Sequence, residues 1–143
     1  MNIIIYKSEI EEALKRESSL VSKMPLSDKG GTIHDILYID ENEFKVLEGA
    51  YQDAVSVITS ALREFLSFDP EVTEASVVYS LRKSYPEMGK AIKSDIVGYI
   101  VKAIMAQWVA VVLPAQKPQY EQSALTTLNN LNTKLYYKAP PLR

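Results

Sequence analysis

The longest regular pattern of apolar and polar positions lies between residues 40 and 66. Apolar side chains recur there every three or four residues, at Phe44, Leu47, Tyr51, Ala54, Val55, Ile58, Ala61, Leu62 and Phe65. Asp40 is followed three residues later by Glu43, which is the spacing of a capping box at a helix N-terminus. The pattern predicts one long amphipathic helix over residues 41–66.

Two shorter helical patterns lie near the ends of the chain. Ser8 and Glu11 have the spacing of a capping box, and a first helix is predicted over residues 9–23, ending before Pro25. A last helix is predicted over residues 118–136, because Pro118 is tolerated in a first helical turn. Its apolar stripe consists of Tyr120, Ala124, Leu125, Leu128, Leu131 and Leu135.

The segment from about residue 87 to 113 has a helical period but is apolar on nearly all sides. One face is formed by Ile92, Ile96, Tyr99, Ile100, Ala103, Ile104, Trp108 and Val111. Such a helix is either central in a bundle or a membrane span. Lys102 and Gln107 fall near the middle of the most apolar stretch, and a charge there costs about 3 kcal/mol on insertion scales. A buried central helix and no membrane span are therefore predicted.

A period of two replaces the helical period between residues 76 and 82, where Val77, Tyr79 and Leu81 alternate with more polar neighbours. This alternation predicts a half-buried strand. Its partner is the N-terminal "NIIIY", the "TIHDILYI" run at 32–39, or a strand of a neighbouring subunit. A helix over 74–84 is the alternative. Residues 25–35 combine Pro, Gly, Ser and Asp, which predicts a mobile loop.

These elements predict a mainly α fold, a four-helix domain with one short strand or β-hairpin. The chain has 143 residues, of which 47% are hydrophobic, enough for a single domain with its own core. We expect this domain to cover residues 1–137 and to be followed by an extended C-terminal tail over residues 138–143. The Pro residues of the "YYKAPPLR" end lower the entropy cost of docking such a tail, although a disordered end without function is an equal alternative.

The composition excludes several kinds of chemistry. The chain has no Cys and a single histidine, His34, which rules out disulfides, cysteine nucleophiles and sites that need two imidazoles. The acidic residues near the predicted helix starts are explained by the helix dipole. We therefore predict no catalytic residue, no cofactor and no metal site, and not an enzyme. A site built from His34, Asp40 and scattered carboxylates is the enzymatic alternative. The N-terminus is not a secretory signal, so a cytoplasmic protein is expected.

The charge is distributed unevenly along the chain. Residues 1–73 carry 7 basic and 14 acidic side chains, a net charge of −7, whereas residues 74–143 carry 9 basic and 4 acidic ones, a net charge of +5. The two halves form either two solvated faces of one monomer or a head-to-tail contact between copies. Because no Lys/Arg cluster is longer than Arg82–Lys83, nucleic-acid recognition fits less well.

The C-terminal half also carries a family resemblance. An apolar helix with "AQWVAVVLP", a short break, "QYEQSALTTLNNLNTKLYY" and a basic, Pro-containing end resemble small virion proteins of tailed phages and prophages of Bacteroidales. Those proteins are usually interpreted as head–tail connectors, also called adaptor or head-completion proteins. The resemblance covers residues 40–66 and 92–143.

The resemblance implies a non-catalytic structural protein that forms a ring, commonly a dodecamer, beneath the portal at the head–tail junction. Its partners would be copies of itself, the portal protein and the next tail or connector protein. DNA would pass through the channel without sequence-specific binding. The protein would reside in the host cytoplasm during assembly and then in the virion. The residues predicted to form protein interfaces are Trp108, Tyr120, Tyr136, Tyr137, Lys138, Pro140, Pro141 and Arg143. A small helical protein-binding or regulatory module in the cytoplasm is the alternative.

Overall fold

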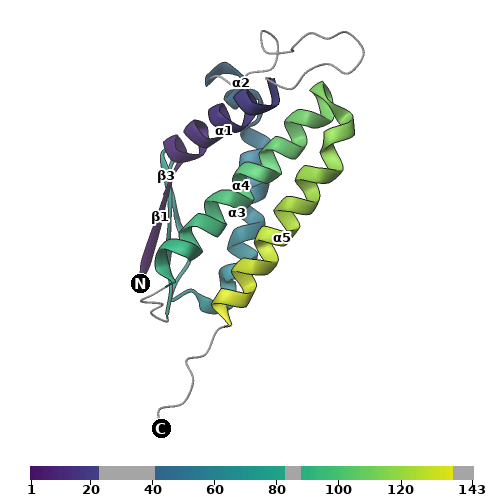
Figure 1. The fold of residues 1–143 in the computed structure, drawn as a ribbon. Helices are drawn as coiled ribbons and strands as arrows, with labels where there is room; N and C mark the ends of the chain where they lie inside the picture. The colour runs from purple at the N-terminus through teal and green to yellow at the C-terminus, as the bar shows by residue number, and fades with distance from the viewer. Residues whose placement is uncertain (23–40, 83–87, 137–143) are drawn as a thin grey trace, which may run out of the picture.

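The protein is a helical bundle with a small antiparallel sheet on one flank (Figure 1). The computed structural model describes residues 1–22, 41–82 and 88–136, without the side chains of residues 21–22 and 41–43. The mainly α fold with a short β-sheet is confirmed. The predicted loop at 25–35, the candidate strand at 32–39 and the tail at 138–143 lie outside the described residues.

The centre of the bundle is α4, Gly89–Val112, which contacts α1, α3, α5 and the sheet. Its fully buried residues include Ile92, Ile96 and Ile104, as the apolar pattern predicts. Val111 was predicted on the buried face but is 84% exposed, because the last turn of α4 packs on its neighbours on one side only and buries Val109 instead. By length and composition, α4 is the one described helix that could cross a membrane. Of its most apolar 18-residue stretch, 44% is buried inside the protein, and core helices of soluble proteins have the same composition.

A tight connection folds the chain back from α4 to α5, Lys117–Leu135. The connection is the 3-10 turn η2, Pro114–Gln116, and Pro118 follows in the first turn of α5, as predicted. The two helices approach closely at Gly98, where an added Cβ would lie 3.6 Å from Thr127 Cγ2. The two helices form a long antiparallel hairpin (Figure 1).

The long helix predicted over residues 41–66 is wrong as one continuous element. It is divided into α2, Glu41–Val46, α3, Glu48–Leu62, and the 3-10 turn η1, Arg63–Phe65. At Leu47 the backbone N–H donates to the Phe44 carbonyl oxygen over 3.0 Å, a tighter turn than an α-helix makes. The apolar period continues across this break, so the pattern could not reveal it.

The sheet has the strand order β1-β3-β2, with β1 at Asn2–Tyr6, β2 at Glu71–Val72 and β3 at Ser76–Ser80. The predicted strand is confirmed, and its partner is "NIIIY", paired antiparallel so that Ile4 lies opposite Val78. The helical alternative for 74–84 is wrong. Val77 and Tyr79 are each 1% exposed, in agreement with the period of two. The short β2 strand was not predicted.

The first helix, α1, Lys7–Ser22, follows β1 without a loop. Ser8 is therefore the second residue of the helix and cannot be its N-cap, so the predicted Ser8–Glu11 capping box is wrong. Instead, the backbone N–H of Lys7 donates to the Ala75 carbonyl oxygen over 2.8 Å and continues the strand pairing into the helix. Ile10 and Leu14 anchor α1 in the core, with no exposed surface.

Candidate functional site

Two of the predicted interface residues lie in the core of the single chain. The Trp108 side chain is 5% exposed and the Tyr120 side chain 9%, so neither is available to a partner on a folded copy. Tyr120 is covered from α4, where Lys102 Nζ lies 5.5 Å from its ring centroid. Burial, with a smaller contribution from the nearby Glu17 carboxylate, raises the pKa of the Tyr120 hydroxyl. Both aromatic residues stabilise the fold.

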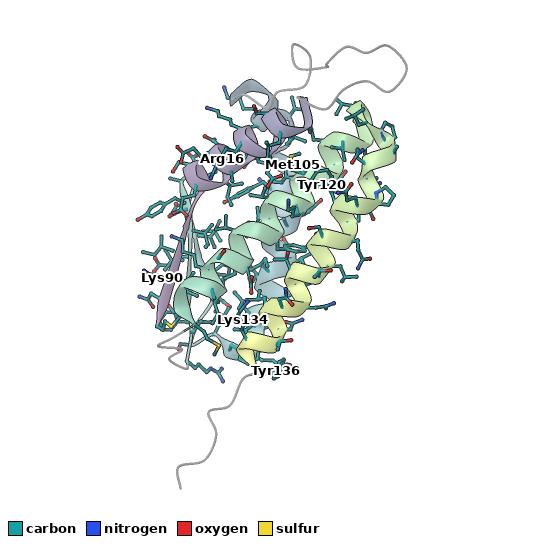
Figure 2. All side chains as sticks on the ribbon, viewed as in Figure 1. Arg16, Lys90, Met105, Tyr120, Lys134 and Tyr136 are labelled. Atoms are coloured by element: carbon teal, nitrogen blue, oxygen red, sulfur yellow. The ribbon has the colours of Figure 1, made fainter. Side chains whose placement is uncertain are left out.

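Tyr136 is the predicted interface residue that the structure places on the surface, with 60% of it exposed (Figure 2). Its hydroxyl donates a hydrogen bond to Glu64 Oε2 over 3.1 Å, and its ring packs edge-on against Phe65 at 5.0 Å. The hydrogen bond to Glu64 raises the pKa of Tyr136. The contact fixes the end of α5 against η1. Five further interface residues, Tyr137, Lys138, Pro140, Pro141 and Arg143, lie outside the described residues.

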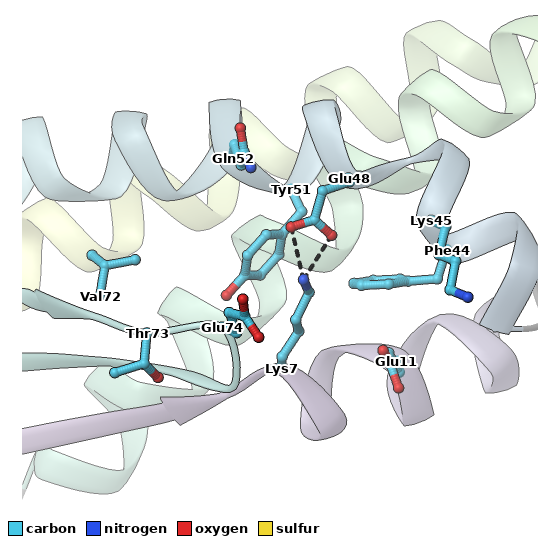
Figure 3. Close-up of a pocket in the computed structure, with 10 residues that line it drawn as sticks. All are labelled: Lys7, Glu11, Phe44, Lys45, Glu48, Tyr51, Gln52, Val72, Thr73 and Glu74. Atoms are coloured by element: carbon cyan, nitrogen blue, oxygen red, sulfur yellow. Dashed lines mark hydrogen bonds and ion pairs between the residues drawn. The ribbon is translucent and has the colours of Figure 1, made fainter.

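A hollow with a volume of about 1010 Å³ lies where the sheet, α1 and the α2–α3 junction meet (Figure 3). Its lining residues are Lys7, Glu11, Phe44, Lys45, Glu48, Tyr51, Gln52, Val72, Thr73 and Glu74. Lys7 lies at its centre, with Nζ 2.7 Å from a Glu48 carboxylate oxygen. The same ammonium lies 5.5 Å from the Phe44 ring centroid and 5.1 Å from that of Tyr51.

Three polar residues of this hollow, Lys7, Glu48 and Thr73, are engaged in structural contacts. The ammonium of Lys7 is held by an ion pair and two aromatic rings. The Thr73 hydroxyl accepts hydrogen bonds from the backbone N–H groups of Ala75 and Ser76, which stabilises the β2–β3 turn. Across residues 1–22, 41–82 and 88–136, no three His, Cys, Asp or Glu side chains are grouped to hold a metal ion.

Ion pairs within the chain join the acidic and basic halves. Lys93 Nζ lies 3.1 Å from Glu9 Oε1, and Lys102 Nζ lies 3.3 Å from Glu17 Oε1, so α4 is tied to α1 twice. These pairs lie along a groove of about 420 Å³ between the two helices. Part of the charge asymmetry is thus balanced inside one copy, which favours the monomer interpretation for these lysines.

The exposed side of α5 is uncharged over its central three turns. We call this surface the α5 strip, which consists of Gln122, Leu125, Thr126, Asn129, Asn130 and Thr133, all exposed. Leu125 is 50% exposed and borders a hollow of about 300 Å³ between α4 and α5. Val111 adds an exposed apolar side chain at the end of α4. Leu125 was expected in the apolar stripe of the last helix but is half exposed, and the exposure of Val111 was not foreseen either.

The chain matches no protein-family model, no curated protein and no solved structure.

Proposed function

We propose that this chain is a non-catalytic structural protein of a tailed-phage virion. In this proposal, copies form a ring, commonly a dodecamer, at the head–tail junction beneath the portal. The observation that carries the proposal is the α5 strip, an exposed helix face without charge that includes the half-exposed Leu125. Charged residues are depleted at the centres of protein interfaces, and amide and hydroxyl groups are tolerated there.

A ring subunit needs a body that does not deform when copies associate. The α4–α5 hairpin supports this requirement, because two long helices pack side by side. Lys134 and Asp95 form an ion pair between the end of α5 and the start of α4, which fixes the open end of the hairpin. Such a body is expected to associate with small backbone changes.

Closed rings require two different surfaces on each copy, since a head-to-tail contact joins unlike faces. Helix α5 lies on one flank of the bundle and the sheet with α1 on the other (Figure 1). Because Lys93 and Lys102 are paired with glutamates of their own chain, we propose that the ring contact rests on the α5 strip rather than on charge attraction. The portal and the next tail or connector protein would bind the ends of the ring.

The proposal is tested by exchanging the gene in the phage that carries it. Leu125→Glu puts a charge in the α5 strip and is expected to yield filled heads and separate tails that do not join. Val46→Glu is the matched control, because Val46 is 81% exposed on α2, away from the α5 strip. Normal tailed particles with Leu125→Glu would contradict the proposed contact. A chain absent from all particles would instead favour the helical protein-binding module in the cytoplasm.

A further inference from the structure

The N-terminal strand β1 has one paired and one unpaired edge. In the strand order β1-β3-β2, β1 is an edge strand. The Met1 carbonyl oxygen accepts from the Leu81 N–H over 2.8 Å, and the Lys7 N–H donates to Ala75 over 2.8 Å. Because backbone groups alternate along a strand, Asn2, Ile4 and Tyr6 direct theirs to the other edge. No hydrogen bond in the described part of the chain joins that edge to another segment.

This edge lacks the features that protect natural sheet edges. Proteins usually protect an edge with charged residues, proline, a bulge or a very short strand. β1 has five residues, "NIIIY", with none of these features. By contrast, the opposite edge strand, β2, has only two residues, and one of them is Glu71. Ile4 and Tyr6 are also 37% and 47% exposed on the outer face of the sheet. A strand of this kind needs a partner strand.

The unpaired backbone donors and acceptors of β1 are complementary to those of a second copy of β1. In an antiparallel pair centred on Ile4, the Ile4 N–H of each copy donates to the Ile4 carbonyl oxygen of the other. The Tyr6 N–H of each copy donates to the Asn2 carbonyl oxygen of the other. Asn2 and Tyr6 then lie opposite one another on the outer face, and no like charges meet in the strand pair.

The charges at the two ends of β1 favour the same arrangement. After Tyr6, the first two turns of α1 include Glu9, which is paired with Lys93 of the same chain, and the exposed Glu12. At the other end of β1, Met1 contacts the first turn of α4 at Gly89, next to the exposed Lys90 (Figure 2). An antiparallel partner brings opposite ends of the strands together. In such a pair, Glu12 of one copy lies at the same end of the paired strands as Lys90 of the other, twice in the dimer, and the two charges attract.

We infer that a second copy of this chain pairs with β1, giving a two-fold dimer with one six-stranded sheet of order β2-β3-β1-β1-β3-β2. This contact goes beyond the proposed ring and does not rest on it, since it joins like faces and closes on two copies. It is therefore expected for the purified protein alone.

Cysteine cross-linking tests the dimer directly, because the chain has no Cys of its own. In the Ile4→Cys variant, the two Cα atoms lie about 5.5 Å apart, within the range that a disulfide spans. Mild oxidation is expected to give a covalent dimer. Asn2→Cys and Tyr6→Cys are matched controls on the same face. Each is expected to form no cross-link alone, since the two cysteines of its dimer are about 14 Å apart, and to cross-link when the two variants are mixed.

Sedimentation of the unoxidised protein gives an independent measurement. Wild type is expected to have twice the monomer mass, and Ile4→Lys to weaken the dimer on the order of tenfold or more. Lys90→Glu is expected to weaken the dimer, and the double variant Glu12→Lys, Lys90→Glu to restore it. A monomeric wild type without cross-linking of Ile4→Cys would overturn the inference. Equal cross-linking of all three cysteine variants alone would also overturn it, because it would indicate random collisions.

Discussion

Lys7 and Glu48 are 41 residues apart in the chain, yet the lysine ammonium lies 2.7 Å from the glutamate carboxylate. The contact joins the start of α1 to the start of α3 beside the rings of Phe44 and Tyr51. It fixes the position of α1 relative to α3 at the hollow between the sheet and the helices.

Loss of this contact is expected to destabilise the fold modestly. Lys7→Met should lower the free energy of unfolding by about 1–2 kcal/mol, because a partly exposed ion pair and two cation–π contacts are lost. The measurement is urea denaturation followed by circular dichroism. Lys45→Met is the control, since Lys45 lines the same hollow but is exposed, and its effect should stay within about 0.5 kcal/mol. Equal effects of the two variants would contradict the role assigned to Lys7.

Tyr79 forms a polar contact between the sheet and α3, and its hydroxyl makes the stability of the protein depend on pH. The Tyr79 hydroxyl lies 3.0 Å from Thr59 Oγ1, and the residue is 1% exposed. Burial raises its pKa above 10.0, and the hydrogen bond with Thr59 only partly offsets this. The unfolded chain therefore releases this proton at a lower pH than the folded one. The contribution of Tyr79 to the free energy of unfolding is fully present below pH 10, and it is lost as the pH rises through the pKa of Tyr79 in the folded protein.

Tyr79→Phe tests both properties of this group. It is expected to lower the free energy of unfolding by about 1 kcal/mol at pH 7, since a buried hydrogen bond is lost. Above pH 10 the variant should also lose less stability than wild type does, measured as the shift of the urea midpoint. An unchanged alkaline slope in Tyr79→Phe would show that Tyr79 does not contribute to it.

The fluorescence of the single tryptophan reports whether Trp108 stays in the core of each chain when copies assemble. Trp108 is 5% exposed inside one chain, so its emission should be blue-shifted in the monomer and move to the red only on unfolding. Assembly should leave the emission unchanged. A blue shift that depends on protein concentration would instead place Trp108 at an interface. Trp108→Ala is expected to cost about 3–5 kcal/mol, as a large cavity forms in the core.

Lys90 and Lys93 belong to the same basic stretch, but their replacement should have different effects. Lys93→Glu places a carboxylate beside Glu9 and is expected to lower the free energy of unfolding by about 0.5–1 kcal/mol. Lys90 is exposed, so Lys90→Glu should change the free energy of unfolding by less than about 0.5 kcal/mol. Denaturation at low protein concentration measures both. Similar losses would mean that the pairing of Lys93 with Glu9 contributes nothing to stability.

The sequence predicted which segments are helical and that residues 76–82 form a strand, because hydrophobic periodicity and Pro positions determine these features. It left three candidate partners for that strand, and the structure shows that the partner is β1. The sequence did not predict the break at Leu47, since apolar side chains keep their spacing through the tighter turn. It also could not separate a buried aromatic residue from an interface one, because Trp108 and Tyr120 occupy apolar helix positions in either case. The unpaired edge of β1 depends on strand order, which no local pattern contains.

The proposed place of the protein in the virion is tested most directly by quantitative mass spectrometry of purified phage particles, with copies counted against the portal protein. The account predicts about one copy per portal subunit, as stacked rings with matching symmetry require. Absence from the particle, or a number unrelated to the portal, would contradict the connector function.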